Sequence, residues 1–164
     1  MDALNLLKQD HRTVEKLFEQ FLGAKETGQQ QQLCEQICTE LNAHTALEEQ
    51  CFYPEIRTVA ELGDIVDESL QEHSKVKQMC SSIQAMQAGD AQLRTRMMEL
   101  KQAVEHHVKE EENEMFPQVR ESCEQQWLLS LGQTMEQQKT TIQQQAPSEQ
   151  RITEDVREPS RKRV

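Results

Sequence analysis

Residues 44–54 read HTALEEQCFYP and residues 107–117 read HVKEEENEMFP, so the second stretch repeats the first at a constant offset of 63. The aligned pairs are His44 and His107, Glu48 and Glu111, Glu49 and Glu112, and Pro54 and Pro117. Because the pairs align in a single reading frame, the chain is predicted to consist of two similar halves that share a short pattern, H-x-x-x-E followed by a proline.

A second, shorter repeat lies upstream of each of these stretches. Residues 9–14 read QDHRTV and residues 71–76 read QEHSKV, which places His11 on His73 at an offset of 62. Each half therefore contains a single histidine, a gap of 33 or 34 positions, and then the H-x-x-x-E motif.

The apolar residues around these motifs recur every three or four positions, which is typical of amphipathic helices. The first predicted helix ends at Gly23. The second runs from Gln30 to Tyr53, the third from Gly63 to Gly89, and the fourth from Gln92 to Phe116. We expect Pro54 and Pro117 to end the second and fourth helices, because the residue before a proline is disfavoured in a helix. The prediction is an all-α, up-down-up-down four-helix bundle.

The bundle is expected to occupy residues 1–120. An apolar pattern around Trp127 and Met135 predicts a short fifth helix within 121–144, packed on the bundle. Residues 145–164 are polar, contain two prolines and lack periodicity, so this tail is predicted to be disordered.

Composition and charge limit the possible functions. The chain has 164 residues, 35% of them hydrophobic and 4% aromatic, with a net charge of −11. This charge argues against a partner bound through phosphate contacts, so we expect neither nucleic acid nor membrane binding. The sequence has no long apolar segment and no signal-peptide core, so we expect a cytoplasmic monomer whose five cysteines are reduced thiols.

The repeated motif predicts a metal site. Residues four apart share one face of a helix, so the histidine and glutamate of each H-x-x-x-E reach the same point. At about 1.5 Å of rise per residue, the four histidines also lie at similar heights in the bundle. A buried, unpaired carboxylate is very costly, and the inner stripes carry no lysine or arginine, so a metal ion is the simplest counterion for Glu48 and Glu111.

The ligand types indicate the metal. Four imidazoles and two carboxylates are too many for one structural zinc ion, and they suit two ions that share bridging carboxylates. Such mixed nitrogen and oxygen ligation is typical of non-haem iron, with manganese or zinc as possible substitutes. Six ligands leave coordination positions open for water, hydroxide, oxygen, peroxide or nitric oxide.

The arrangement H…H-x-x-x-E…H…H-x-x-x-E, with E-E-x-x-[FM]-[FY]-P at the end of each half, resembles the hemerythrin-like (HHE cation-binding) family over about residues 3–120. Ferritin-like di-iron proteins instead carry E-x-x-H, with the carboxylate first. The resemblance implies that His11 and His44 bind one iron, that His73 and His107 bind the other, and that Glu48 and Glu111 bridge the two, with an oxo, hydroxo or water bridge between the ions.

Oxygen-carrying hemerythrins have a fifth histidine ligand, and this sequence has no clear counterpart. His106 is the one candidate, but it lies about 100° around the helix from His107 and is expected to be a surface or supporting residue. Glu49 and Glu112 either support the histidines or face solvent. Cys51 and Glu114 are expected to line the site, Tyr53 to serve packing, and Asp10 and Glu72 to be exposed.

The sequence favours a di-iron protein that binds oxygen or a related oxidant for sensing, storage or delivery. The alternative is an enzyme of the peroxide-decomposing, catalase-like class. A third hypothesis, iron sensing or repair of iron centres, ranks lowest, because repair-type relatives usually carry a cysteine-bearing segment before the first histidine. Beyond the proposed metal ligands, no catalytic residue is assigned.

Overall fold

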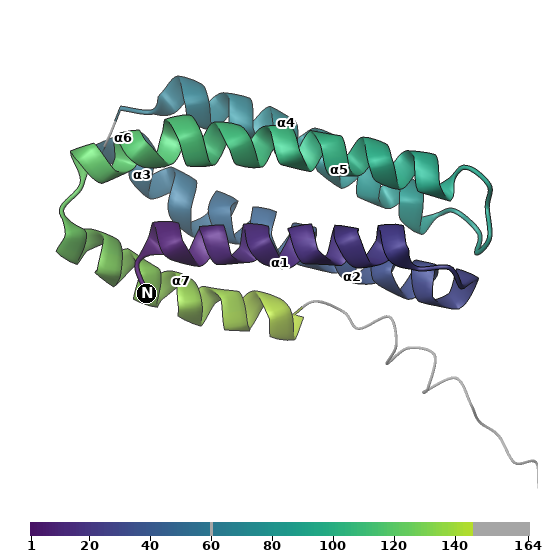
Figure 1. Ribbon diagram of the computed structural model, residues 1–164. Coiled ribbons are helices and arrows are strands. Elements are labelled where there is room, and N and C mark those ends of the chain that lie inside the picture. Colours follow the sequence, from purple (N-terminus) through teal and green to yellow (C-terminus); the bar gives the residue numbers. More distant parts are fainter. Residues whose placement is uncertain (60, 146–164) are drawn as a thin grey trace, which may run out of the picture.

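The structure is a computed structural model that describes residues 1–59 and 61–145 (Figure 1). Four long helices form its body: α1 (Ala3–Gly23), α2 (Thr27–Leu47), α4 (Gly63–Gln84) and α5 (Leu93–Glu110). The ring of contacts runs from α1 to α2, on to α4 and α5, and back to α1. Because short loops join consecutive helices, neighbours run antiparallel. The predicted all-α four-helix architecture is confirmed.

The second and fourth helices continue past their prolines, so the prediction that Pro54 and Pro117 end them is wrong. Helix α2 passes through a π-helical turn, η1 (Glu48–Phe52), into α3 (Tyr53–Val59), and α5 passes through η2 (Glu111–Met115) into α6 (Phe116–Ser122).

The reason lies in the hydrogen bonds of these turns. The backbone N–H of Tyr53 donates to the carbonyl of Glu48, and that of Phe116 donates to Glu111, five residues back in each case. A π turn contains one extra residue and leaves one carbonyl without a donor. A proline, which has no N–H to donate, is tolerated directly after such a turn.

Helix α7 (Gln125–Gln145) lies along α1 and α2 (Figure 1). With 21 residues it is as long as α1, longer than the short helix expected. It buries Leu128, Leu131 and Met135. At Gly132 the backbone of Met1 and Asp2 approaches so closely that a Cβ would collide with the Met1 carbonyl oxygen. Of the tail predicted to be disordered, Gln145 ends α7 and 146–164 lie outside the described residues.

The apolar core forms two clusters, one toward each end of the bundle. One includes Leu7, Leu47 and Met115, and the other includes Val14, Leu41 and Val104. The residues between Leu7 and Val14 on α1, and between Leu41 and Leu47 on α2, include histidines that the sequence singled out. A polar layer is thus enclosed between two apolar ones. In the described part of the chain, no helix is long and apolar enough to cross a membrane.

Candidate metal centre

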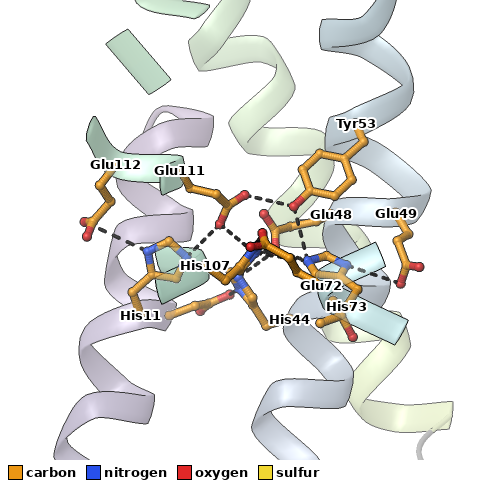
Figure 2. Close-up of polar contacts among 12 residues, drawn as sticks. His11, His44, Glu48, Glu49, Tyr53, Glu72, His73, His107, Glu111 and Glu112 are labelled. Atoms are coloured by element: carbon orange, nitrogen blue, oxygen red, sulfur yellow. Dashed lines mark hydrogen bonds and ion pairs between the residues drawn. The ribbon is translucent and has the colours of Figure 1, made fainter. Parts of the chain in front are cut away.

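The six residues expected to bind metal meet in this polar layer (Figure 2). Each long helix contributes one histidine, and each π turn begins with one of the glutamates. The six are His11, His44, His73, His107, Glu48 and Glu111, and all are buried; both glutamates are 0% exposed. The histidine rings pair in the two halves, with centroids 4.9 Å apart for His11 and His44 and 4.8 Å apart for His73 and His107.

Both glutamates touch histidines of both halves. Glu48 Oε1 lies 2.7 Å from Nε2 of His44 and 3.3 Å from Nε2 of His73. Glu111 Oε1 lies 3.2 Å from Nε2 of His11 and 3.2 Å from Nε2 of His107. Each carboxylate therefore stands between the two halves.

Several of these atoms are buried without a hydrogen-bond partner. They include Nε2 of His11 and of His44, both carboxylate oxygens of Glu48, and Oε1 of Glu111. Ligand atoms of His11, His44 and Glu111 lie within 4.8 Å of one another, and so do those of Glu48, His73 and His107. Unsatisfied buried polar atoms are costly and need a partner. Two cations bound to these nitrogens and oxygens would satisfy them, so the donor set fits a two-metal centre.

Without metal, protons on His11, His44 and His107 offset the nearby carboxylate charge. Burial opposes a charge on His44, but the Glu48 and Asp10 carboxylates outweigh it and raise the pKa of His44 to about 10. Although burial has the opposite effect, neighbouring carboxylates also raise the pKa of His11 and His107. Burial likewise opposes ionisation of Glu48, yet the positive charge of His44, whose Nε2 lies 2.7 Å from Glu48 Oε1, holds the pKa of Glu48 well below the ordinary value. A metal ion must displace these protons to bind.

A second set of carboxylates faces the outer nitrogens of the histidines. Nδ1 of His44 lies 3.2 Å from Asp10 and Nδ1 of His107 lies 2.8 Å from Glu72. The other two contacts are longer: 3.7 Å from His73 to Glu49, and 3.9 Å from His11 to Glu112. Such outer carboxylates fix the orientation of a histidine ring and keep its Nε2 directed inward.

Each outer carboxylate in turn contacts a basic side chain. The pairs are Asp10 with Lys139, Glu72 with His106, Glu49 with Lys77, and Glu112 with Arg12. The nearby His11 imidazole and the Arg12 guanidinium lower the pKa of Glu112 to about 2. Lys139 belongs to α7, so this helix contacts the polar layer through Asp10.

The expectation that Asp10 and Glu72 are exposed is wrong. Asp10 is buried beside His44 and Lys139, and Glu72 is half-buried against His107. The cause for Asp10 is α7, which packs along α1 and covers a face that a four-helix bundle leaves open. A signal was present in the sequence, because an acid precedes the single histidine in both halves.

Tyr53 was expected to serve packing, but its hydroxyl reaches the site. It donates to Glu111 Oε2 at 2.9 Å and lies 3.1 Å from His73 Nε2. The extra residue of the π turn rotates all later side chains by about 100°, which brings Tyr53 round from the far side of the helix. Burial and the nearby Glu111 and Glu48 raise the pKa of Tyr53 well above its ordinary value, so the hydroxyl keeps its proton.

Three other candidates lie apart from the six. His106 is exposed, and its Nε2 contacts Glu110 at 3.0 Å and Glu72 at 3.3 Å. Cys51 is half-buried against the apolar cluster that contains Leu47, and Glu114 is exposed. The expectation that Cys51 and Glu114 line the site is therefore wrong. The π turns that contain these two residues change the directions of their side chains, as they do for Tyr53.

Comparisons with known proteins identify the family and the fold. The family model described as "Hemerythrin HHE cation binding domain" matches residues 2–119. The fold is similar to the crystal structure of a hemerythrin HHE cation-binding domain-containing protein from Mycobacterium kansasii, with a TM-score of 0.77 and 21% identity over 88% of each chain. A protein named DNA nickase from Nostoc sp. (strain PCC 7120) is 26% identical over 144 residues. That match covers 88% of this chain but 41% of the relative, so the chain spans well under half of that protein.

Proposed function

The chain belongs to the hemerythrin HHE cation-binding domain family, and on this premise we propose that its centre holds two iron ions and binds oxygen or a related small oxidant. The proposed ligands are His11 and His44 for one ion, His73 and His107 for the other, and Glu48 and Glu111 as bridges. The protein would serve in sensing, storage or delivery of the bound molecule.

One observation carries this proposal. Each glutamate contacts a histidine from both halves, and the contacting nitrogens and oxygens include buried atoms that lack hydrogen bonds. A carboxylate that binds a single ion needs to lie beside the histidines of only one half. The double contact supports two ions that share both carboxylates.

The donor types support iron. Four imidazole nitrogens and carboxylate oxygens suit iron, and manganese and zinc are the competitors to exclude. Bound iron would supply open coordination positions and a reversible change between the ferrous and ferric states.

The chain supplies the surroundings. The two apolar clusters exclude bulk water from the layer. Asp10 and Glu72 hold His44 and His107 in place through their outer nitrogens. Tyr53 keeps a proton on its hydroxyl beside Glu111 and is the proton donor nearest that bridge.

The alternative function is decomposition of hydrogen peroxide, and the position of the Tyr53 hydroxyl supports it. By giving up its hydrogen bond to Glu111, the protonated Tyr53 hydroxyl can instead donate one to a polar oxidant near the centre. Iron sensing and repair of iron centres remain lower-ranked proposals, since no observation on the described residues favours them.

We also propose that the partner is a small molecule and that the protein is a cytoplasmic monomer. The net charge of −11 argues against phosphate binding. The match covers only 41% of the Nostoc relative, so we do not assign the nicking activity in that protein's name to this chain.

The test is the iron content of the purified protein, followed by stopped-flow mixing of the reduced protein with oxygen and with peroxide. We expect two iron ions per chain and an absorption change with oxygen that reverses under argon. Sustained oxygen evolution from peroxide would favour the alternative. An iron content that stays the same in the His44→Ala, His107→Ala double variant would overturn the ligand assignment.

A further inference from the structure

A small cavity adjoins the four histidines. Its volume is about 20 Å³, enough for one water-sized molecule. Besides the histidines and Asp10, its walls are mostly apolar and consist of Val14, Leu41, Thr45, Val76, Val104 and Val108. Neither Glu48 nor Glu111 lines it. The cavity therefore touches the proposed centre on its histidine side.

A larger groove of about 550 Å³ lies between α1 and α5. Exposed residues such as Arg12, Glu105 and Lys109 form its rim, so it is open to solvent. The residues that line both the groove and the cavity are His11, Val14, Val104 and Val108. Beside His11, three valine side chains thus separate solvent from the space at the histidines.

The internal repeat provides a comparison for the contact between α1 and α5, which we call the α1–α5 seam. The positions of Val14, Val104 and Val108 correspond to Val76, Leu41 and Thr45 in the other seam, between α2 and α4. These three line the cavity but not the groove. Helices α2 and α4 also contact each other more extensively than α1 and α5 do. The two seams are therefore unequal, and the α1–α5 seam is the thinner barrier.

We propose that small ligands reach the centre through the α1–α5 groove, and that Val14, Val104 and Val108 form the constriction that limits their size. This inference rests on the proposed function, because it assumes a ligand that binds beside the four histidines. Valine has few rotamers within a helix, so passage requires the two helices to separate briefly, and each added or removed carbon changes the barrier.

The charges of the groove suit neutral molecules and small anions. Its basic residues Arg12, Lys101 and Lys109 are matched by the acidic residues Glu15, Glu105 and Glu112. The rim is thus close to neutral, whereas the whole chain carries −11. Dioxygen, nitric oxide, hydrogen peroxide and azide can enter it without strong repulsion, and the apolar constriction excludes anything larger.

The first test needs no metal. Dissolved oxygen is paramagnetic and speeds the NMR relaxation of the methyl groups that it approaches, so oxygen pressure applied to the metal-free chain maps its path. We expect a larger enhancement at the methyls of Val14, Val104 and Val108 than at those of Val76 and Leu41. Equal enhancement on both seams, or a larger one at Val76 and Leu41, would overturn the proposal.

The second test follows azide binding to the iron-loaded protein. Val14→Ala and Val76→Ala are a matched pair, because both valines are buried, line the same cavity and occupy equivalent positions of the repeat. We expect azide association and dissociation in Val14→Ala to be roughly tenfold faster than in Val76→Ala, equivalent to about 1.4 kcal/mol in the barrier. Equal rates in the pair would contradict the path.

Val104→Leu gives the α1–α5 seam the residue that the other seam has at Leu41, and it should slow both azide rates. Because a path residue changes the two rates by the same factor, the azide affinity should stay constant; unchanged rates, or an affinity change that comes from one rate alone, would contradict the proposal. A chain that takes up no iron would contradict the proposed function instead, and the oxygen relaxation experiment would still decide whether the path exists.

Discussion

The two halves of the chain share their histidines and glutamates, but they differ in the residue that follows each π turn. Tyr53 donates a hydrogen bond to Glu111 and contacts His73, whereas the equivalent Phe116 stacks on His11 with ring centroids 6.1 Å apart. The outer partners differ too, since Lys139 of α7 holds Asp10 and the exposed His106 holds Glu72. The repeat thus duplicates the proposed ligands, while the surroundings make the two proposed metal positions unequal.

The largest expected effect is on iron content, and it distinguishes a ligand shared by both ions from a ligand of one ion. Glu48→Gln removes a carboxylate that contacts both halves, so the iron content should fall from two ions per chain to none. His11→Ala and His73→Ala each remove a ligand from one half and should each leave one ion. Iron analysis against protein concentration measures this, and one remaining ion in Glu48→Gln would show that Glu48 serves a single half.

The metal-free protein should lose stability as the pH rises. The pKa of His44 is about 10 in the fold, against about 6.5 in the unfolded chain. Its contribution is therefore fully present below pH 6.5 and disappears as the pH rises toward 10. Because the pKa of Glu48 is lowered, its contribution is present above about pH 4.5 and is lost in acid.

Bound metal replaces these protons, so the stability gained from iron should increase between about pH 6.5 and pH 10, by a few kcal/mol in total. Urea unfolding of the metal-free and iron-loaded chains across this range measures the difference. A constant difference would mean that the imidazoles do not carry the balancing charge.

Tyr53→Phe makes the two halves more alike. The change removes a hydrogen bond to a buried carboxylate, and we expect it to destabilise the metal-free protein by about 2 kcal/mol in urea unfolding. In the iron-loaded protein, Mössbauer spectra should show two distinct sites in the wild type that become more similar in Tyr53→Phe. A wild type with two identical sites would contradict the inequality of the halves.

A smaller effect is expected from the outer carboxylates. Asp10→Asn and Glu72→Gln loosen His44 and His107, and each should weaken iron binding by about 10- to 100-fold in competition with a chelator. The loss should be greater for Asp10, which is buried, than for Glu72, which is half-buried. The reverse order would show that the Lys139 contact does not strengthen the first half.

The sequence predicted the four helices and the meeting of the six residues, because the periodicity and the repeat depend on local geometry. It did not predict the surroundings. An ideal helix across Glu48–Phe52 and Glu111–Met115 gives the wrong positions for Tyr53, Cys51 and Glu114, because both segments are π turns. The burial of Asp10 depends on α7, which lies more than a hundred residues later in the chain. Local patterns do not contain such tertiary information.

The central proposal is a pair of iron ions held by six side chains. The most direct measurement is a crystal structure of the iron-loaded protein with anomalous diffraction data collected at the iron absorption edge. We predict two peaks in the polar layer, one beside His11, His44 and Glu111 and the other beside Glu48, His73 and His107. A single peak there, or iron only at the partly exposed group of Glu72, His106 and Glu110, would contradict the account.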